Sequence, residues 1–142
     1  MKRLLIIFAG LALVVSLAAG GFAATTKAPK SSTIMIRHQT RGCHTWSVNG
    51  GAYRATLSTS LARGGTITFM NMDVMPHKLL KTSGPATHFA GKPNMNHMNA
   101  SVKVTFSKAG VYRFTTKPGE DYMKGMKTIG EDNVLHLTVK VS

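Results

Sequence analysis

Four short segments of this chain carry side chains that bind soft or borderline metal ions. One places a cysteine beside a histidine, a second places a histidine after Met-Pro, a third mixes histidine with methionine, and a fourth carries two methionines. In chain order these segments are residues 42–46, 75–77, 88–98 and 122–126. Thiolate and thioether sulfur suit copper(I), and imidazole suits copper and zinc among other ions. The residue types therefore indicate a transition-metal site, with copper as the first candidate.

Cys43 is the only cysteine, so the chain cannot form an internal disulfide. Its thiol is free, paired with another chain, or bound to a metal ion. A free exposed thiol is reactive in an oxidising compartment, and metal ligation would remove that liability. The competing interpretation is a buried cysteine that packs as a small hydrophobic residue.

The first 23 residues have the pattern of a secretory signal peptide. A basic start and an apolar run are followed by small residues at the −3 and −1 positions of a predicted cleavage site after Ala23. The alternative is an uncleaved anchor, because the apolar run is about long enough to span a bilayer. In both cases the domain lies outside the cytoplasm, in the periplasm or secreted. Residues 24–32 form a polar linker, and a single domain occupies residues 33–142.

The pattern of this domain is β throughout. Apolar and polar residues alternate, as in half-buried strands, most weakly in the second of seven segments. These segments are 33–38, 53–61, 66–71, 78–82, 100–107, 111–116 and 134–141. Short strands joined by Gly-rich turns are typical of a sandwich or a Greek-key barrel. The intervals 84–99 and 117–132 are expected to lack regular structure, and long loops in a small domain often carry function.

Two segments resemble conserved parts of cupredoxins, the blue copper proteins. GTITFMNMDVMPH, from Gly65 to His77, resembles the strand and loop that carry the first copper-binding histidine of the family. FSKAGVYRF, from Phe106 to Phe114, resembles the hairpin that leads into the metal loop. The resemblance implies an all-β, cupredoxin-like Greek-key β-sandwich that binds one copper ion, with His77 as its first ligand.

The second half of the usual copper site is missing from the chain. In the family, a cysteine, a second histidine and usually a methionine come from the loop before the last strand. Counting from the FSKAGVYRF segment, the position expected to hold cysteine is Thr116, and no histidine follows before Met123. An ordinary blue copper site is therefore not expected.

A relocated site is the sharpest hypothesis that the sequence supports. By the family resemblance, the loop after the first strand lies at the same end of the sandwich as the metal loops, and Cys43 and His44 fall in that loop. They would supply the thiolate and the second imidazole, and Met123 or Met126 would supply an axial sulfur. Neighbouring residues of a regular strand point to opposite faces, so this arrangement requires an irregular backbone at Cys43 and His44.

Other histidines and methionines have simpler interpretations. His38 lies in a strand with outward polar neighbours, and it is expected to be structural, as is His136 in the last strand. Met95, His97 and Met98 form a cluster that is either a copper-loading site or ordinary packing, because methionine fills apolar gaps without any function.

The composition also limits the partners. The chain has 18 Lys and Arg against 5 Asp and Glu, a formal charge of +13. A basic surface suits an acidic redox-partner protein or the surface of an anionic membrane, although it also keeps an exported protein soluble. Nucleic acid is not expected, because the basic residues are scattered and no helix or aromatic-basic platform gathers them.

The predicted function is one-electron transfer by an exported, copper-binding protein that is not an enzyme. No Ser/His/Asp arrangement, paired carboxylates or phosphate-binding glycine loop is recognisable. Two alternatives remain open at this point. One is an extracytoplasmic copper carrier or resistance protein without redox turnover, and the other is a metal-free interaction sandwich.

Overall fold

The structure is a computed structural model that describes residues 27–38, 44–125 and 134–142. Ten strands and one short 3-10 helix lie within these ranges. The elements are β1 Ser31–His38, β2 His44–Val48, β3 Thr56–Leu61, β4 Gly65–Asn71, β5 His77–Ser83, β6 His88–Ala90, β7 Asn94–Met95, β8 Ser101–Phe106, β9 Gly110–Pro118, η1 Gly119–Asp121 and β10 His136–Val141.

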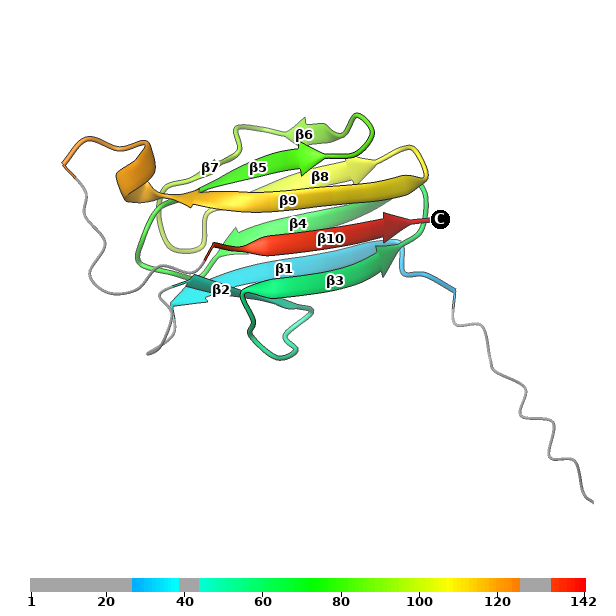
Figure 1. Ribbon diagram of the computed structural model, residues 1–142, viewed down its shortest axis with the longest axis horizontal. Helices are drawn as coiled ribbons and strands as arrows, with labels where there is room; N and C mark the ends of the chain where they lie inside the picture. Colours follow the sequence, from blue (N-terminus) through cyan, green and yellow to red (C-terminus); the bar gives the residue numbers. More distant parts are fainter. Residues whose placement is uncertain (1–26, 39–43, 126–133) are drawn as a thin grey trace, which may run out of the picture.

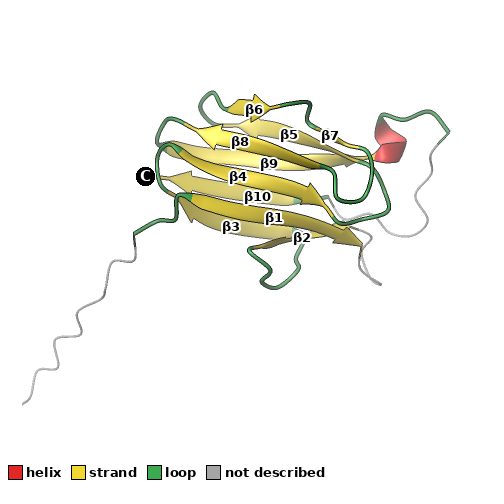
Figure 2. Cartoon of the chain, turned by 180° about the vertical axis from the view of Figure 1, so that it is seen from behind, coloured by secondary structure: helices red, strands yellow, loops and turns green. Residues whose placement is uncertain are grey.

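The strands form two five-stranded sheets packed face to face, with orders β2-β1-β4-β8-β6 and β3-β10-β9-β5-β7. The second sheet is nearer the viewer in Figure 1. In Figure 2 the molecule is seen from behind, and the first sheet is nearer the viewer. β1 pairs with β4, and β10 with β3, in parallel, whereas the other pairs between named strands are antiparallel. The chain changes sheet at every connection from β2 to β9, which is why neighbours in a sheet are often distant in sequence. The predicted fold class, an all-β, cupredoxin-like Greek-key sandwich, is confirmed.

The core follows from alternation along the strands. In β4, Ile67 and Phe69 are fully buried, while Thr66, Thr68 and Met70 are half-exposed. Phe69 and Phe106 both lie against Phe114, with ring centroids 5.4 and 5.9 Å away, and Tyr112 meets Phe106 edge to face. Full burial of each large apolar side chain contributes roughly 1.5–3 kcal/mol, so this layer holds the two sheets together.

Three strands were not expected from the sequence. β2 lies where a loop was predicted, and β6 and β7 lie in the interval 84–99 that was predicted to be irregular. Residues 44–47 of β2 are all buried. Thr45 and Ser47 alternate with Trp46 and Val48, but this pattern spans only four residues, the shortest run that indicates a strand. β6 and β7 span three and two residues, too few to show any period.

The seven predicted strands are present, with boundaries shifted by a few residues. β9 is longer than predicted and runs on to Pro118, where it pairs with His77 at the start of β5. β7 pairs with the other side of β5, placing Met95 beside His77. The first residue of β5 is therefore held between two strands, which fixes the backbone position of His77.

The predicted signal peptide, residues 1–23, lies outside the described residues, as does part of the predicted linker. In the portion of the chain that the structure describes, no helix has the length and apolar character needed to cross a membrane.

Candidate metal centre

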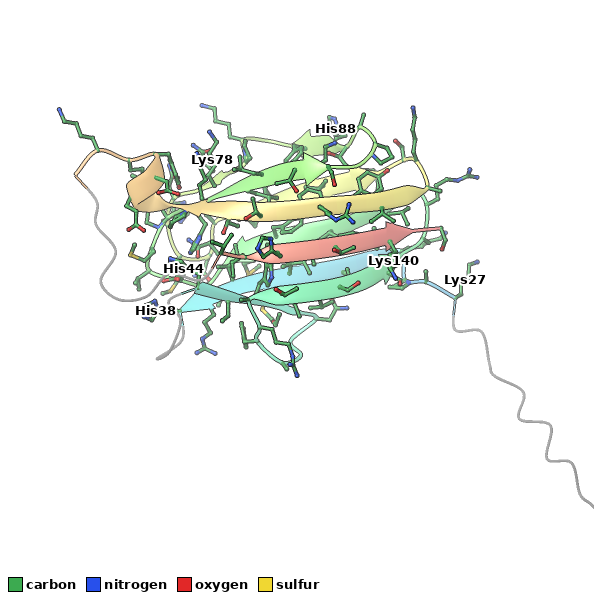
Figure 3. The ribbon with its side chains drawn as sticks, in the orientation of Figure 1. Lys27, His38, His44, Lys78, His88 and Lys140 are labelled. Carbon is green, nitrogen blue, oxygen red and sulfur yellow. The ribbon has the colours of Figure 1, made fainter. Side chains whose placement is uncertain are left out.

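Polar side chains gather at one end of the sandwich, where four segments of the chain meet. His38 ends β1, His44 begins β2, Asp73 follows β4, and His77 begins β5. Figure 3 labels His38 and His44 at this end, opposite the end at which the chain terminates. The site is thus made of strand ends, at the edge of a packed core.

The hairpin of β1 and β2 places the first two histidines. His38 and His44 are direct partners in the antiparallel register, so their side chains lie on the same face of the sheet. Ile34 and Ile36 have the same parity as His38 and are fully buried, so that face is the inner one. His44 is 2% exposed, whereas the His38 side chain is 50% exposed. One histidine therefore lies inside the pocket and the other at its rim.

Asn71 folds the loop that carries the carboxylate. Its side-chain oxygen accepts a hydrogen bond from the backbone N–H of Asp73 at 2.8 Å. Its side-chain nitrogen donates to the carbonyl oxygens of Met75 at 2.7 Å and Met95 at 3.0 Å. Asp73 in turn accepts the backbone N–H of Met75 at 3.0 Å through Oδ1. These bonds close a tight loop between β4 and β5 and leave Oδ2 of Asp73 directed at the histidines.

Three imidazoles converge on this one oxygen. Oδ2 of Asp73 lies 3.2 Å from Nδ1 of His44, 3.4 Å from Nε2 of His77 and 3.9 Å from Nδ1 of His38. The rings of His44 and His77 are perpendicular, with centroids 4.6 Å apart. The side chains of Asp73 and His77 are fully buried. A buried carboxylate is costly to desolvate, and the surrounding imidazoles compensate for that cost.

The electrostatics keep Asp73 ionised. Burial raises the pKa of its carboxyl, but the hydrogen bonds from His44 and His77, the N–H of Met75 and the charge interaction with His77 outweigh it. The net effect is a pKa well below the usual range of an aspartate. The centre therefore contains a permanent negative charge at neutral pH.

The structure brings together two of the five residues that the sequence proposed as metal ligands. His44 and His77 are neighbours, as expected, although His44 belongs to a strand and not to the predicted loop. Met123 follows η1 and is half-buried, at the same end of the sheet because β9 reaches Pro118 beside His77. Cys43 and Met126 lie outside the described residues, so their roles as ligands stay predictions.

Two members of the centre were missed in the sequence. His38 was interpreted as structural, yet its ring lies 6.5 Å from that of His44. Asp73 was noted only as part of a motif. His38, His44 and Asp73 together offer three ligand atoms that all lie within 4.8 Å of one another. For both residues, the signal was the alternation of inward-facing and outward-facing side chains along a strand. In β1, for example, Ile36 and His38 share one face.

The methionine–histidine cluster does not form a site. Met95 is fully buried in the hydrophobic core. His97 is exposed, and its Nδ1 lies 2.9 Å from the carbonyl oxygen of Met98. The packing interpretation therefore holds for Met95, and the cluster does not gather its sulfur and nitrogen atoms around a common point.

No protein-family model matches the chain, and no curated protein matches its sequence. Among solved structures, an oxidized mutant of amicyanin is 16% identical, with a TM-score of 0.42 over 78% of this chain and 82% of the other. A purple cupredoxin from Nitrosopumilus maritimus is 20% identical, with a TM-score of 0.44 over 78% and 99%. An inclusion body protein from Burkholderia cenocepacia is 10% identical, with a TM-score of 0.46 over 83% and 99%. Similarity at this level concerns the fold alone.

The donors at this end of the sandwich fit a first-row transition metal. Two buried imidazoles, a third imidazole at the rim and one carboxylate are ligand types that copper(II) and zinc(II) both accept. Because β-strand pairing fixes the backbone of His44 and of His77, their side chains are held for binding before any ion arrives.

Proposed function

We propose that this chain is an extracytoplasmic copper protein that transfers single electrons. The observation that carries the proposal is the contact between His44 and His77, whose buried rings lie 4.6 Å apart although 33 positions separate them in sequence. Two imidazoles at the end of a β-sandwich, with one delivered by the MNMDVMPH loop, are what the resemblance to cupredoxins predicts.

The residues have distinct tasks in this proposal. His44 and His77 would bind the ion through imidazole nitrogens, and Cys43, which precedes His44 in the sequence, is the predicted source of a thiolate. Met123 or Met126 supplies the weak sulfur. Bound copper supplies a one-electron couple between Cu(I) and Cu(II). Strand pairing at His44 and His77 would limit the movement of the two imidazoles when the charge of a bound ion changes.

Different side chains shield the centre from water and connect it to the surface. The His44 and His77 rings exclude water from the centre, since they are 2% and 0% exposed. The half-exposed His38 is the group of the centre that reaches solvent. A partner that approaches this end of the sandwich would therefore come within a few ångströms of the buried ligands.

The charge distribution supports the proposal of an acidic redox partner. None of the ten described strands contains an acidic residue, and all five in the chain lie at position 73 or within residues 120–132. Lys78 and Lys117 are direct cross-strand partners on β5 and β9, and Lys117 is exposed. Like charges opposite each other destabilise a sheet slightly, so an anionic partner would relieve them.

The carrier alternative has less support. It relies on the Met95, His97 and Met98 cluster together with Cys43 and His44 to hold and hand over copper, and Met95 is enclosed in the core. The buried carboxylate of Asp73 also favours the more highly charged ion, whereas a Cu(I) carrier is expected to rely on sulfur.

The test is copper titration of the exported protein, followed by visible absorption, electron paramagnetic resonance and voltammetry. We expect one copper per chain and a reversible one-electron couple, both lost in His77→Ala and both retained in the control His88→Ala, which alters an exposed histidine of β6. Cys43→Ser runs alongside, since an intense visible band that disappears in this variant identifies the thiolate ligand. Tight Cu(I) binding without a reversible couple would establish the carrier, and the absence of any copper binding would leave only the sandwich.

A further inference from the structure

We infer that Asp73 and His38 are themselves metal ligands, so that the centre binds its ion through three imidazoles and one carboxylate oxygen. The inference rests on the proposed function, because it concerns the same ion, but it assigns a different ligand set. It makes the sulfur of Cys43 dispensable for binding.

The first support is that three imidazoles from separate segments surround one carboxylate oxygen, and the ligand atoms of His38, His44 and Asp73 lie within 4.8 Å of one another. Nitrogens of His38, His44 and His77 each lie within 4 Å of the same Oδ2 of Asp73. Each oxygen of a carboxylate has about two acceptor sites. Those of Oδ2 of Asp73 are used by His44 and His77, and Oδ1 accepts the backbone N–H of Met75. The third imidazole is therefore not needed to satisfy the carboxylate.

The second support comes from the distances. A hydrogen bond from an imidazole N–H to a carboxylate is charge-assisted and typically spans about 2.7–2.9 Å. Ligands about 2.0–2.1 Å from a tetrahedral metal ion lie about 3.3 Å from one another. The separations from Oδ2 to His44 and His77, 3.2 and 3.4 Å, are long for the first arrangement and match the second.

His38 needs only a small movement to join the set. Its nitrogen lies 3.9 Å from Oδ2 of Asp73, about 0.6 Å beyond the tetrahedral separation. Because half of its side chain is exposed and it ends β1, it is able to rotate toward the ion without displacing the core. A single mobile ligand at the rim also provides a route for the ion to enter.

The charge of the set predicts which ion is preferred. One carboxylate among three neutral imidazoles offers a hard anionic oxygen and no sulfur, which suits Cu(II), Zn(II) and Co(II) better than Cu(I). The reduction potential of bound copper is accordingly lowered by Asp73, because the negative charge stabilises the oxidised ion more than the reduced one.

The competing explanation places Asp73 outside the ligand set. A carboxylate that accepts N–H groups from metal-bound histidines orients their rings, and loss of such a partner weakens metal binding 10- to 100-fold. Affinity alone therefore does not separate the two explanations. The readout must report which atoms contact the metal.

The experiment uses Co(II) and Cu(II) as probes on Cys43→Ser, which removes the thiolate from consideration. Pulsed electron paramagnetic resonance of the Cu(II) form counts coordinated imidazoles, and nuclear magnetic resonance of the Co(II) form detects strongly shifted β-protons of a coordinated aspartate. Two variants are compared, Asp73→Asn and His38→Gln. The amide oxygen of the first keeps an acceptor for the Met75 N–H, and the second alters a half-exposed side chain, so both are expected to fold. His88→Gln is the matched control at another exposed histidine.

We expect three coordinated imidazoles that fall to two in His38→Gln and stay at three in His88→Gln. We also expect shifted aspartate β-protons that vanish in Asp73→Asn, with a loss of Cu(II) affinity of 100-fold or more. Two imidazoles in every protein and no shifted aspartate would overturn the inference while leaving the copper proposal intact. If Cys43→Ser binds neither ion but the unaltered chain binds copper, the thiolate is essential and the inference fails. If the unaltered chain binds no copper, both fail.

Discussion

Oδ2 of Asp73 lies 3.2 Å from Nδ1 of His44, although 29 positions separate the two residues in the sequence. His44 begins β2, and Asp73 follows β4. β1 lies between β2 and β4 in the sheet, so the contact bridges across the end of β1. His38, the last described residue of β1, lies beside both groups, with its Nδ1 3.9 Å from Oδ2 of Asp73 and its ring 6.5 Å from that of His44. The contact therefore joins the strands on either side of β1, and the end of β1 contributes to the same centre.

The stability of the metal-free protein is expected to depend on the charge of Asp73. Its folded pKa is below the value of about 3.9 that holds in the unfolded chain, so its stabilising contribution is present above that pH. The contribution is lost as the pH falls through the folded pKa. In urea unfolding at pH 7, Asp73→Asn should be less stable by about 3 kcal/mol, as for a buried pair that loses one partner.

The difference between the two proteins should shrink at pH 2, below the pKa of an aspartate in the unfolded chain, because the lowered pKa of Asp73 in the folded state then contributes less to stability. Asp121→Asn is the control, because Asp121 is exposed and lies outside the centre. An unchanged difference from pH 7 to pH 2 would show that the loss arises from packing and not from charge.

Asn71 is expected to determine the shape of the loop that carries Asp73. Asn71→Ala removes the donor to the carbonyl oxygens of Met75 and Met95 and the acceptor for the Asp73 N–H. Each buried polar group left without a partner costs about 1–3 kcal/mol, so we expect a loss of at least 2 kcal/mol in chemical unfolding. Copper affinity should fall with it, because Asp73 and His77 flank the loop. Full stability in this variant would mean that the loop is held by other contacts.

Met95 and Met98 give a matched pair for the interpretation of the methionine cluster. Met95→Ala creates a cavity in the core and should cost about 2–5 kcal/mol in the free energy of unfolding. Met98→Ala alters a residue that is 46% exposed and should change stability by less than about 0.5 kcal/mol. Copper stoichiometry should be the same in Met98→Ala and the unaltered chain. A reduced stoichiometry in that variant would restore the idea of a loading site.

The basic surface should be visible in the rate of electron exchange with a small charged oxidant. With an anionic iron complex the rate should fall as ionic strength rises, and with a cationic cobalt complex it should rise. Reversal of two charges in Lys78→Glu/Lys117→Glu should reduce the rate with the anion by about tenfold at low salt.

The control for that experiment is Lys103→Glu/Lys108→Glu, which changes the net charge equally but on and beyond β8 in the other sheet. An equal effect in both double variants would mean that only net charge matters, and the pair at Lys78 and Lys117 would have no special place in docking.

The fold could be predicted from the sequence because alternation is strong in most strands. Val102, Val104 and Phe106 of β8 are buried in turn, and the residues between them are exposed or half-exposed. β2 was not predicted because its polar–apolar alternation, from Thr45 to Val48, covers only four residues. Short strands such as β7 arise from pairing with β5 and have no local signature.

The candidate site could be predicted in part. His77 was found by a motif and His44 by its chemistry beside a lone cysteine. His38 and Asp73 could have been found by counting every second residue onward from the apolar, inward-facing ones. This count leads from Ile36 to His38 and from Phe69 to Asp73. The alternation along a strand does not reveal which strand ends lie together, because that depends on the pairing of β1 with both β2 and β4.

The donors of this centre lie on four separate strand ends, above a core that does not depend on them for its packing. A single substitution at any one end changes the chemistry without changing how the sheets pair. Thr116, where the family resemblance expects a cysteine, is buried in β9. The strand pairing and the metal-binding groups can therefore be altered separately, one strand end at a time.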